Sequence, residues 1–366
     1  MQRAIALTML LALGLPAAGE FRGLEGDLHQ RRAREVMADL DEHFWLRRGE
    51  CYAEERDGRK PAAIWGGGIM FSALVGGARH DEAFERRMHR YFRGLERYWD
   101  EEVKVPGYEP YPTRGGGNDK YYDDNAWMVL TFLEAYELSD DRRYLRRAEA
   151  TLDFVLSGWD DAAGGGIWWH EGHKDGSKNT CVNAPAALGC YRLARHAEGE
   201  RKQELNEWGD RLVKWTVEKF RDDDLYMDRL EVDGGRLHRG KLTYNTALMI
   251  RSFLALHGRT GKDLYLSEAL RSAKAADRFL GRRGAYRDAW KWSHLQVEAD
   301  LETYRLTGDE RYLERAVKTA AAHYERWKER PPKEMIEVAS LARELWLLAD
   351  LETEKGRAFW KEADAW

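Results

Sequence analysis

The chain has 366 residues and a net charge of -5, because 64 acidic and 59 basic side chains nearly balance. That balance lacks the basic footprint of a nucleic-acid-binding protein, and three cysteines are too few for a disulfide framework in a chain of this length. Fifteen tryptophans and seventeen tyrosines are many for a helical protein. Each of these rings either packs in a core or stacks on a sugar in a cleft.

The first twenty residues have the layout of a secretory signal peptide. An apolar run from Ala4 to Leu15 follows one arginine and precedes a proline and small residues. This run is too short to remain as a membrane span, and no later segment reaches that length. We therefore predict a cleaved signal over residues 1–20 and a mature domain over residues 21–366. The mature protein is expected to be secreted or periplasmic, without an integral membrane segment.

An internal repeat organises the rest of the chain. A turn with Gly or Asp precedes a Tyr-Leu-x-x-Ala helix start at Tyr144, Tyr265 and Tyr312, and looser copies occur at Phe84 and Leu205. The unit returns after roughly 50 to 60 residues, which is the length of a helical hairpin with its loops.

Two sets of helices follow from this repeat. Six charged amphipathic stretches are predicted as outer helices, near residues 28–47, 81–99, 141–157, 200–220, 263–280 and 310–328. Six more apolar stretches are predicted as inner helices, which follow Trp65, Asn125, Asn183, Asn245, Ser293 and Pro332. Asn and Ser are favourable N-caps. The pattern predicts an all-α, single-domain (α/α)6 toroid, with strands only in short loop segments such as 164–171.

The loops before the inner helices are candidates for a binding site. If the inner helices all run in one direction, these loops gather at one mouth of the toroid. They hold most of the glycines, tryptophans, tyrosines and paired acids of the chain. A concave rim of this kind is the usual place for a ligand.

Asp123 and Asp124 are adjacent at the start of a predicted inner helix. Adjacent residues at this place can bring their carboxyl groups within roughly 5 to 5.5 Å, the separation in retaining glycosidases. The helix N-terminus favours negative charge, while the neighbouring carboxylate raises the pKa of one of the two. We predict one ionised nucleophile beside one protonated acid. The alternative is an acidic pair that only complements the helix dipole.

The motifs YYDDNAW, GGGIWW, KNTCVNAPAAL and LTYNTALMI, in this order, resemble glycoside hydrolase family 76, the endo-α-1,6-mannanases and their fungal cell-wall relatives. The resemblance extends from about residue 60 to about residue 320. It implies an (α/α)6 barrel that retains anomeric configuration without a metal or another cofactor. In that family pattern Asp123 matches the nucleophile and Asp124 the general acid/base. The CVNAPAALGC segment is an unusual form of the third inner helix.

The resemblance also implies a substrate-binding set. Its expected members lie in or beside these motifs: Tyr122, Asn125, Trp127, Trp168, Trp169, Asn179, Asn183, Asp228, Tyr244 and Asn245. Asp228 matches an acidic residue that faces the reactive sugar, and Trp168 and Trp169 are candidates for a sugar-stacking platform.

The sequence leaves three functions open. The first is an exported retaining glycoside hydrolase that acts on α-mannan or manno-oligosaccharides, as a monomer. The second is a sugar epimerase or isomerase on the same toroid, and the third is a non-catalytic carbohydrate-binding or cell-wall protein. His170 and His173 are three residues apart in a glycine-rich loop, so they do not match the helical zinc motif, and we predict no metal site.

Overall fold

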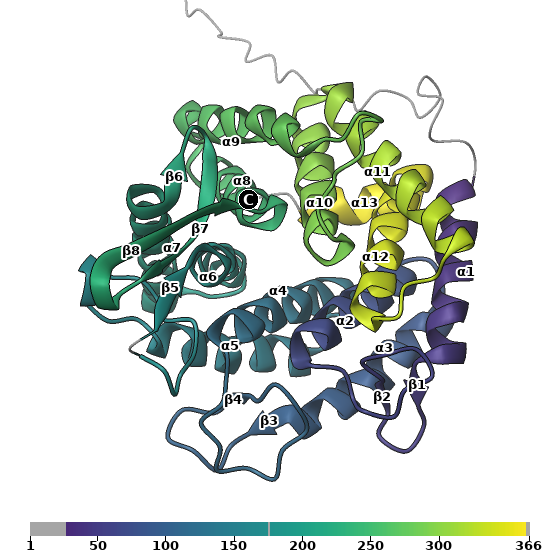
Figure 1. The fold of residues 1–366 in the computed structure, drawn as a ribbon, viewed down its shortest axis with the longest axis horizontal. Coiled ribbons are helices and arrows are strands. Elements are labelled where there is room, and N and C mark those ends of the chain that lie inside the picture. The colour runs from purple at the N-terminus through teal and green to yellow at the C-terminus, as the bar shows by residue number, and fades with distance from the viewer. Residues whose placement is uncertain (1–26, 175, 364–366) are drawn as a thin grey trace, which may run out of the picture.

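The structure is a computed structural model that describes residues 27–174 and 176–363, so the predicted signal peptide lies outside the described residues. Six helices form the inner ring of a toroid (Figure 1). They are α2 (Ile64–Ala78), α4 (Tyr122–Ser139), α6 (Thr180–Ala194), α8 (Thr243–Thr260), α10 (Trp290–Thr307) and α12 (Met335–Glu352). Each inner helix contacts the next, and α12 contacts α2 to close the ring.

Six outer helices surround this ring (Figure 1). They are α1 (Leu28–His43), α3 (Glu82–Leu95), α5 (Arg142–Ser157), α7 (Gly199–Phe220), α9 (Asp263–Ala275) and α11 (Glu310–Glu329). An inner helix faces both the bore and the outer ring, so it is apolar on most sides, and every residue of α6 is buried. An outer helix such as α3 buries only one face. The predicted all-α (α/α)6 toroid is therefore confirmed.

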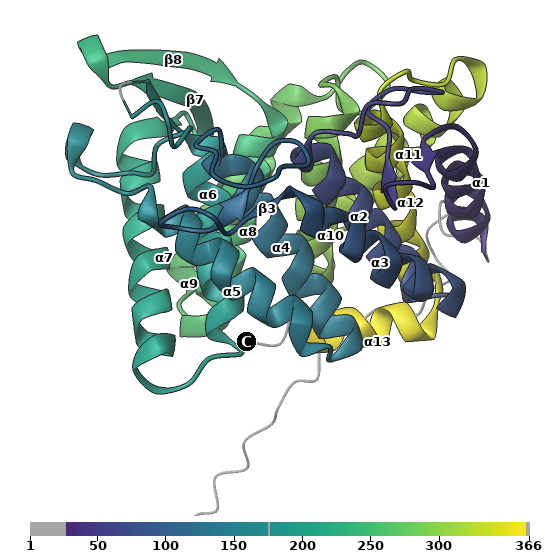
Figure 2. The same ribbon diagram turned by 90° about the horizontal axis from the view of Figure 1, so that it is seen from below.

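One further helix, α13 (Glu354–Ala363), was not expected from the repeat. It lies at the end of the barrel opposite the β7–β8 hairpin (Figure 2). Trp360 Nε1 donates a hydrogen bond to Asp350 Oδ2 over 2.7 Å, and the Arg79 guanidinium lies 5.2 Å from the centre of the Trp360 ring. These contacts attach α13 to the inner ring. None of the described helices is long and apolar enough to cross a membrane.

The strands are short and lie in the loops. They are β1 (Trp45–Leu46), β2 (Cys51–Tyr52), β3 (Trp99–Asp100), β4 (Gly107–Tyr108), β5 (Ser177–Asn179), β6 (Arg221–Asp222), β7 (Leu225–Glu231) and β8 (Arg236–Lys241). β7 is central to one antiparallel sheet and pairs with β5, β6 and β8. Four 3-10 turns complete the elements, at Glu96–Tyr98, Ala162–Gly164, Asp233–Gly235 and Ala276–Phe279.

The prediction of a strand over residues 164–171 was wrong. This segment forms only isolated bridges, of which one joins Trp168 to Lys178 and another joins Tyr121 to His170. The main hairpin of the mouth is instead β7–β8, whose turn contains Gly234 with a φ of 81°. Glycine adopts this left-handed backbone without a steric penalty.

The predicted N-caps were also wrong. The helices begin earlier than the pattern indicated, so Asn125, Asn183, Asn245 and Ser293 all lie inside first turns. Asn125 instead binds the preceding loop: Oδ1 accepts from the Tyr108 amide over 2.8 Å, and Nδ2 donates to the Tyr108 carbonyl over 2.9 Å.

Asn183 repeats this arrangement in the next hairpin. Its Oδ1 accepts from the Ile167 amide over 2.9 Å, and its Nδ2 donates to the carbonyls of Ile167 and Asn179 over 3.3 and 2.8 Å. Asn125 Nδ2 likewise donates to the carbonyl four residues before it, that of Tyr121. Each asparagine therefore holds a mouth loop against the start of an inner helix.

Candidate active site

The starts of α4, α6 and α8 meet at one mouth of the barrel. Cys181, the second residue of α6, has its sulfur 3.4 Å from Asp123 Oδ2, the second residue of α4. Tyr244, the second residue of α8, is close enough to interact with the same thiol. These contacts confirm that the mouth loops gather at one end, and they place the acidic pair there.

The Asp123 carboxylate is held by three donors. Trp169 Nε1 donates to Oδ2 over 2.8 Å, and the Cys181 thiol donates to the same oxygen over 3.4 Å. The backbone amide of Asp124 donates to Oδ1 over 3.0 Å. Because the donors approach both oxygens, they fix the plane of the carboxylate.

Asp124 differs from its neighbour. Its carboxyl group accepts no hydrogen bond from the residues that the structure describes, although both acids are half-buried. Burial and the negative charge of Asp123 raise the pKa of Asp124 well above its ordinary value. The group is therefore a protonated acid with an unoccupied hydrogen-bond donor.

Burial also raises the pKa of Asp123, to about 6, although the hydrogen bonds from Trp169 and Cys181 act in the opposite direction. No Lys, Arg or His forms an ion pair with either carboxyl group within residues 27–174 and 176–363. Both pKa values are raised, and that of Asp124 is raised further because the charge of Asp123 adds to the effect of burial. Two acids whose pKa values differ in this way are suited to the separate roles of nucleophile and general acid.

Trp169 reaches the pair because its backbone is held like a strand between two neighbours. Its carbonyl accepts from the Tyr122 amide over 2.9 Å, and its amide donates to the Ser177 carbonyl over 2.9 Å. The side chain is 40% exposed, and the Tyr121 ring packs edge-on against it at 4.9 Å between ring centres. Trp169 thus combines a hydrogen bond to Asp123 with an open ring face.

Trp168 points to the opposite side, as adjacent residues of extended backbone do. It is 2% exposed, its Nε1 donates to Asp160 over 2.7 Å, and the Lys178 ammonium lies 4.8 Å from its ring centre. Of the two candidate platform residues, only Trp169 is placed to contact a sugar.

Three more expected site residues lie near Cys181. Asp228, on β7, is close enough for its charge to raise the pKa of the Cys181 thiol, and its Oδ2 forms an ion pair with Arg229 at 2.8 Å. The Tyr244 ring lies nearly parallel to that of Trp292, at 6.4 Å between ring centres. Asn245 is fully buried, and neither of its side-chain polar atoms has a partner among the described residues.

The other expected contacts are structural. Tyr122 is 2% exposed and stacks on Phe154 at 4.8 Å, so we assign it to the core. Asn125 and Asn183 hold loops, as described above. Asn179 is also buried, and its Oδ1 accepts from the Ser177 hydroxyl over 2.7 Å. Direct substrate contacts by these four residues are not supported by their positions.

Comparison with known proteins decides the family. The model of glycosyl hydrolase family 76 matches residues 30–289. The chain belongs to this family. It is therefore a glycoside hydrolase, and not the sugar epimerase or isomerase or the non-catalytic binding protein that the sequence left open. No curated protein sequence matches the chain.

Solved structures of family 76 share the fold of this glycoside hydrolase. An α-mannanase from Bacteroides thetaiotaomicron is 22% identical with a TM-score of 0.81, over 91% of this chain and 96% of that one. The α-1,6-mannanase GH76A from Salegentibacter sp. HEL1_6 is 21% identical with a TM-score of 0.76, over 88% and 99%. An inactive variant of that mannanase, with two consecutive aspartates replaced, was solved with α-1,6-mannotriose, at 20% identity, a TM-score of 0.75 and the same coverage.

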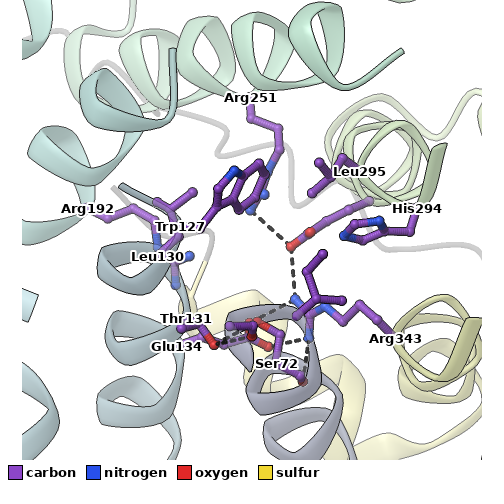
Figure 3. Close-up of a pocket in the computed structure, with 13 residues that line it drawn as sticks. Ser72, Trp127, Leu130, Thr131, Glu134, Arg192, Arg251, His294, Leu295 and Arg343 are labelled. Carbon is purple, nitrogen blue, oxygen red and sulfur yellow. Dashed lines mark hydrogen bonds and ion pairs between the residues drawn. The ribbon is translucent and has the colours of Figure 1, made fainter. Parts of the chain in front are cut away.

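Trp127 of this glycoside hydrolase lines a small cavity inside the barrel. The cavity has a volume of about 30 Å³, room for about one water molecule. Trp127, Arg251, His294 and Arg343 point toward it (Figure 3). Burial lowers the pKa of His294 to about 4, and its Nδ1 lies 3.1 Å from the Trp290 carbonyl, so the ring is neutral at pH 7.

A larger pocket of the hydrolase lies at the rim, beside the exposed face of Trp169. It has a volume of about 470 Å³ and is lined by Tyr121, Trp169, His170 and Arg229, among others. Tyr121 and Cys181 were both missed as site residues. Aligning the repeats on Asn125 and Asn183 would have pointed to Cys181, which stands two residues before Asn183 as Asp123 stands two residues before Asn125.

Proposed function

We propose that this enzyme hydrolyses α-1,6-linked mannose chains with retention of anomeric configuration. The observation that carries the proposal is the asymmetry of the acidic pair. Asp123 is ionised and held by three donors, whereas Asp124 is protonated and has no partner among the described residues. A retaining glycosidase needs a fixed nucleophile beside an acid that is free to reach the leaving group.

In the first step, a carboxylate oxygen of Asp123 attacks the anomeric carbon and forms the glycosyl-enzyme ester. The bond to the glycosidic oxygen breaks, and that oxygen takes the proton of Asp124. In the second step, ionised Asp124 takes a proton from water while the water oxygen attacks the same carbon. The ester bond breaks, Asp123 is ionised again and Asp124 is protonated again.

Two observations support an α-1,6-linked mannose substrate. The α-1,6-mannanase of Salegentibacter shares this fold over nearly its full length, and inactive variants of it were solved with α-1,6-mannotriose and α-1,6-mannotetraose. In the present enzyme the open face of Trp169 lies next to Asp123, where the apolar face of a sugar ring can stack.

Asp228, Tyr244 and Asn245 have polar atoms that suit sugar hydroxyls, and Tyr244 is close enough to Asp123 and Asp228 for their charges to raise its pKa. The buried, unpartnered amide of Asn245 is the most informative of the three, because a buried amide without partners is costly until a ligand satisfies it. We also propose that the enzyme is exported and monomeric. Sequencing the N-terminus of the exported protein and measuring its mass by light scattering test these two points.

Product analysis tests the function. The enzyme is incubated with linear α-1,6-mannan and, separately, with α-1,2- and α-1,3-mannosides. We expect manno-oligosaccharides from the α-1,6-mannan alone, and proton NMR of the earliest product should show the α-anomer. The variant with both Asp123→Asn and Asp124→Asn is the inactive control. Hydrolysis confined to the α-1,2 or α-1,3 substrates would refute the linkage, and a β-anomer as the first product would refute retention.

A further inference from the structure

The Cys181 thiol lies between two polar side chains of the mouth. It donates a hydrogen bond to Asp123 Oδ2 over 3.4 Å, and Tyr244 is close enough to interact with it. A distance of this size is normal for a thiol donor, whose sulfur is larger than oxygen. The three residues come from three inner helices and occupy the second position of each.

The thiol proton has a carboxylate acceptor within reach. A thiol can rotate its proton toward any acceptor nearby, and Asp123 Oδ2 lies 3.4 Å from the sulfur. Cys181 is 3% exposed, which keeps water from competing for this bond.

A simpler explanation is that Cys181 is a small apolar residue in the core, as free cysteines usually are. Cys190, on the same helix, fits that explanation: it is fully buried and makes no hydrogen bond with any described residue. Cys181 differs from Cys190 because its thiol lies near polar side chains of other helices. One of these is Asp123, the acid assigned as the nucleophile. Neither cysteine is in a disulfide.

We propose that Cys181 is a positioning residue for Asp123, which together with Trp169 holds the carboxylate ionised and in a fixed orientation. This inference rests on the proposed function, in which Asp123 is the nucleophile. Trp169 and Cys181 donate to the same oxygen, Oδ2, so the opposite oxygen receives only the Asp124 amide. The geometry therefore assigns Oδ1 as the oxygen that attacks the anomeric carbon.

A thiol is suited to this position because it is a weak donor. A strong donor to Oδ2 would lower the basicity of the carboxylate and with it the nucleophilicity, whereas no donor would leave the charge of a buried group unsupported. Trp169 supplies the stronger bond and Cys181 the weaker one.

The test uses four single variants of the full chain: Cys181→Ala, Cys181→Val, Cys181→Ser and the matched control Cys190→Ala. The readout is the acidic limb of the kcat/KM profile on a manno-oligosaccharide, which reports the ionisation of the free enzyme. Removing a donor to the ionised form raises the pKa of Asp123. For Cys181→Ala and Cys181→Val we expect this limb to move upward by about half to one pH unit.

Cys181→Ser keeps a hydrogen-bond donor, so its acidic limb should shift less than that of Cys181→Ala. Cys190→Ala should leave the limb in place. If Cys181→Ala and Cys181→Val both keep the parent profile, whatever their melting temperatures, Cys181 is only a packing residue and the inference is wrong.

A second measurement separates this inference from the proposed function. Carbon-13 NMR of aspartate-labelled enzyme, assigned with Asp123→Asn, gives the pKa of Asp123 without any substrate. A raised pKa in Cys181→Ala, in an enzyme that does not cleave α-1,6-mannan, would overturn the substrate but keep the hydrogen-bond role of Cys181. An unchanged pKa would overturn that role even if the mannanase activity is present.

Discussion

The enzyme buries carboxyl groups in two regions of its bore and treats them differently. At the mouth, Asp123 and Asp124 lie side by side with no cationic partner among the described residues. Deeper in the bore, acids and arginines from four inner helices and the end of α2 alternate in one chain of ion pairs, in the order Asp350, Arg79, Glu134, Arg343, Glu298, Arg251 and Glu302.

The pKa of a carboxyl group in each region depends on whether charged or neutral groups contact it. Burial acts to raise the pKa of Glu298, yet Arg251 and Arg343 hold it at about 2. Burial raises the pKa of Asp123 to about 6, because only neutral donors oppose it there. The same burial thus produces permanently charged acids in one region and titratable acids in the other. What distinguishes the mouth pair is that neither Asp123 nor Asp124 forms an ion pair with a cationic side chain among the described residues, whereas Glu298 contacts two arginines.

The largest expected effect comes from removing the nucleophile. We expect Asp123→Ala to lower turnover of every mannoside by at least about 10⁴-fold, with no rescue by a better leaving group, since the covalent route is lost. Steady-state kinetics on mannan and on an aryl mannoside measure this effect. The melting temperature should not fall greatly, because the variant also removes an unpaired charge. Turnover near the parent rate would show that the pair is only a helix cap.

Asp124→Ala should have the next largest effect. Without the acid, activity on mannan should fall by about 10²- to 10⁴-fold. The first step should survive on an aryl mannoside with an acidic phenol, which leaves without a proton. Added azide should then release a mannosyl azide of retained configuration, detected by mass spectrometry and NMR. If azide rescues Asp123→Ala instead, the roles of the two acids are exchanged.

Breaking an ion pair inside the barrel should, in contrast, reduce the stability of the fold. Glu298→Gln leaves Arg251 and Arg343 with an excess of buried positive charge, which should destabilise the fold by about 3 kcal/mol. Denaturant unfolding measures the change. Glu314→Gln, which breaks an exposed pair with Lys318, is the control and should cost less than about 0.5 kcal/mol. Equal effects of the two variants would contradict the distinction between the regions.

The pH dependence of stability should also have opposite signs in the two regions. The folded pKa of Asp123 is raised, so its contribution to stability is complete below pH 4 and is lost as the pH rises through about 6. Asp123→Asn should therefore gain stability relative to the parent, on the order of 2 kcal/mol, between pH 4 and pH 7.

The folded pKa of Glu298 is lowered to about 2, so its contribution is present above pH 4.5 and is lost as the pH falls toward 2. The deficit of Glu298→Gln should therefore shrink on acidification. Thermal melts from pH 3 to pH 7 compare both variants with the parent. Parallel curves for the two variants would show that burial, and not the arginines, sets these pKa values.

Trp169→Ala should change stability only slightly. Because the ring is 40% exposed, its loss should cost less than about 1 kcal/mol, although KM should rise and Asp123 lose a donor. Trp168→Ala is the contrast, since this buried ring should cost about 3 to 5 kcal/mol. Thermal melts and substrate titrations of both variants separate the two positions. A large loss of stability in Trp169→Ala would place that ring in the core.

The sequence predicted the helices well because inner and outer helices differ in their apolar pattern. Outer helices are apolar along one stripe, and inner helices are apolar on most sides. It predicted the acidic pair because two adjacent acids stood before an apolar run. It could not show which face a residue occupies, and so Tyr122 and Trp168 were expected in the site although both lie in the core.

Features built from distant segments were also missed. Separate repeats supply Arg79, Glu134 and Arg343. In its local sequence each of them looks like an ordinary charged residue of a helix. Their pairing appears only when the ring closes. Cys181 is of the same kind, because its importance depends on Asp123, which lies in another helix 58 residues earlier in the chain. The asparagines were placed correctly at the mouth, but their partners are loop atoms that no local pattern identifies.

The loop clamps of Asn125 and Asn183 have a consequence for how the rim can change. Asn125 fastens the loop that begins after Tyr108 at both of its ends, because it also binds the Tyr121 carbonyl. With both ends fixed, doubling the length of such a loop adds only about 0.6 kcal/mol of closure entropy. The acids stand two residues and one residue before the clamp, so the same asparagine that fixes the loop ends also follows the acidic pair. The rim is thus an exchangeable part, and grafting loops between Tyr108 and Tyr121 is a direct route to enzymes that accept differently branched glycans.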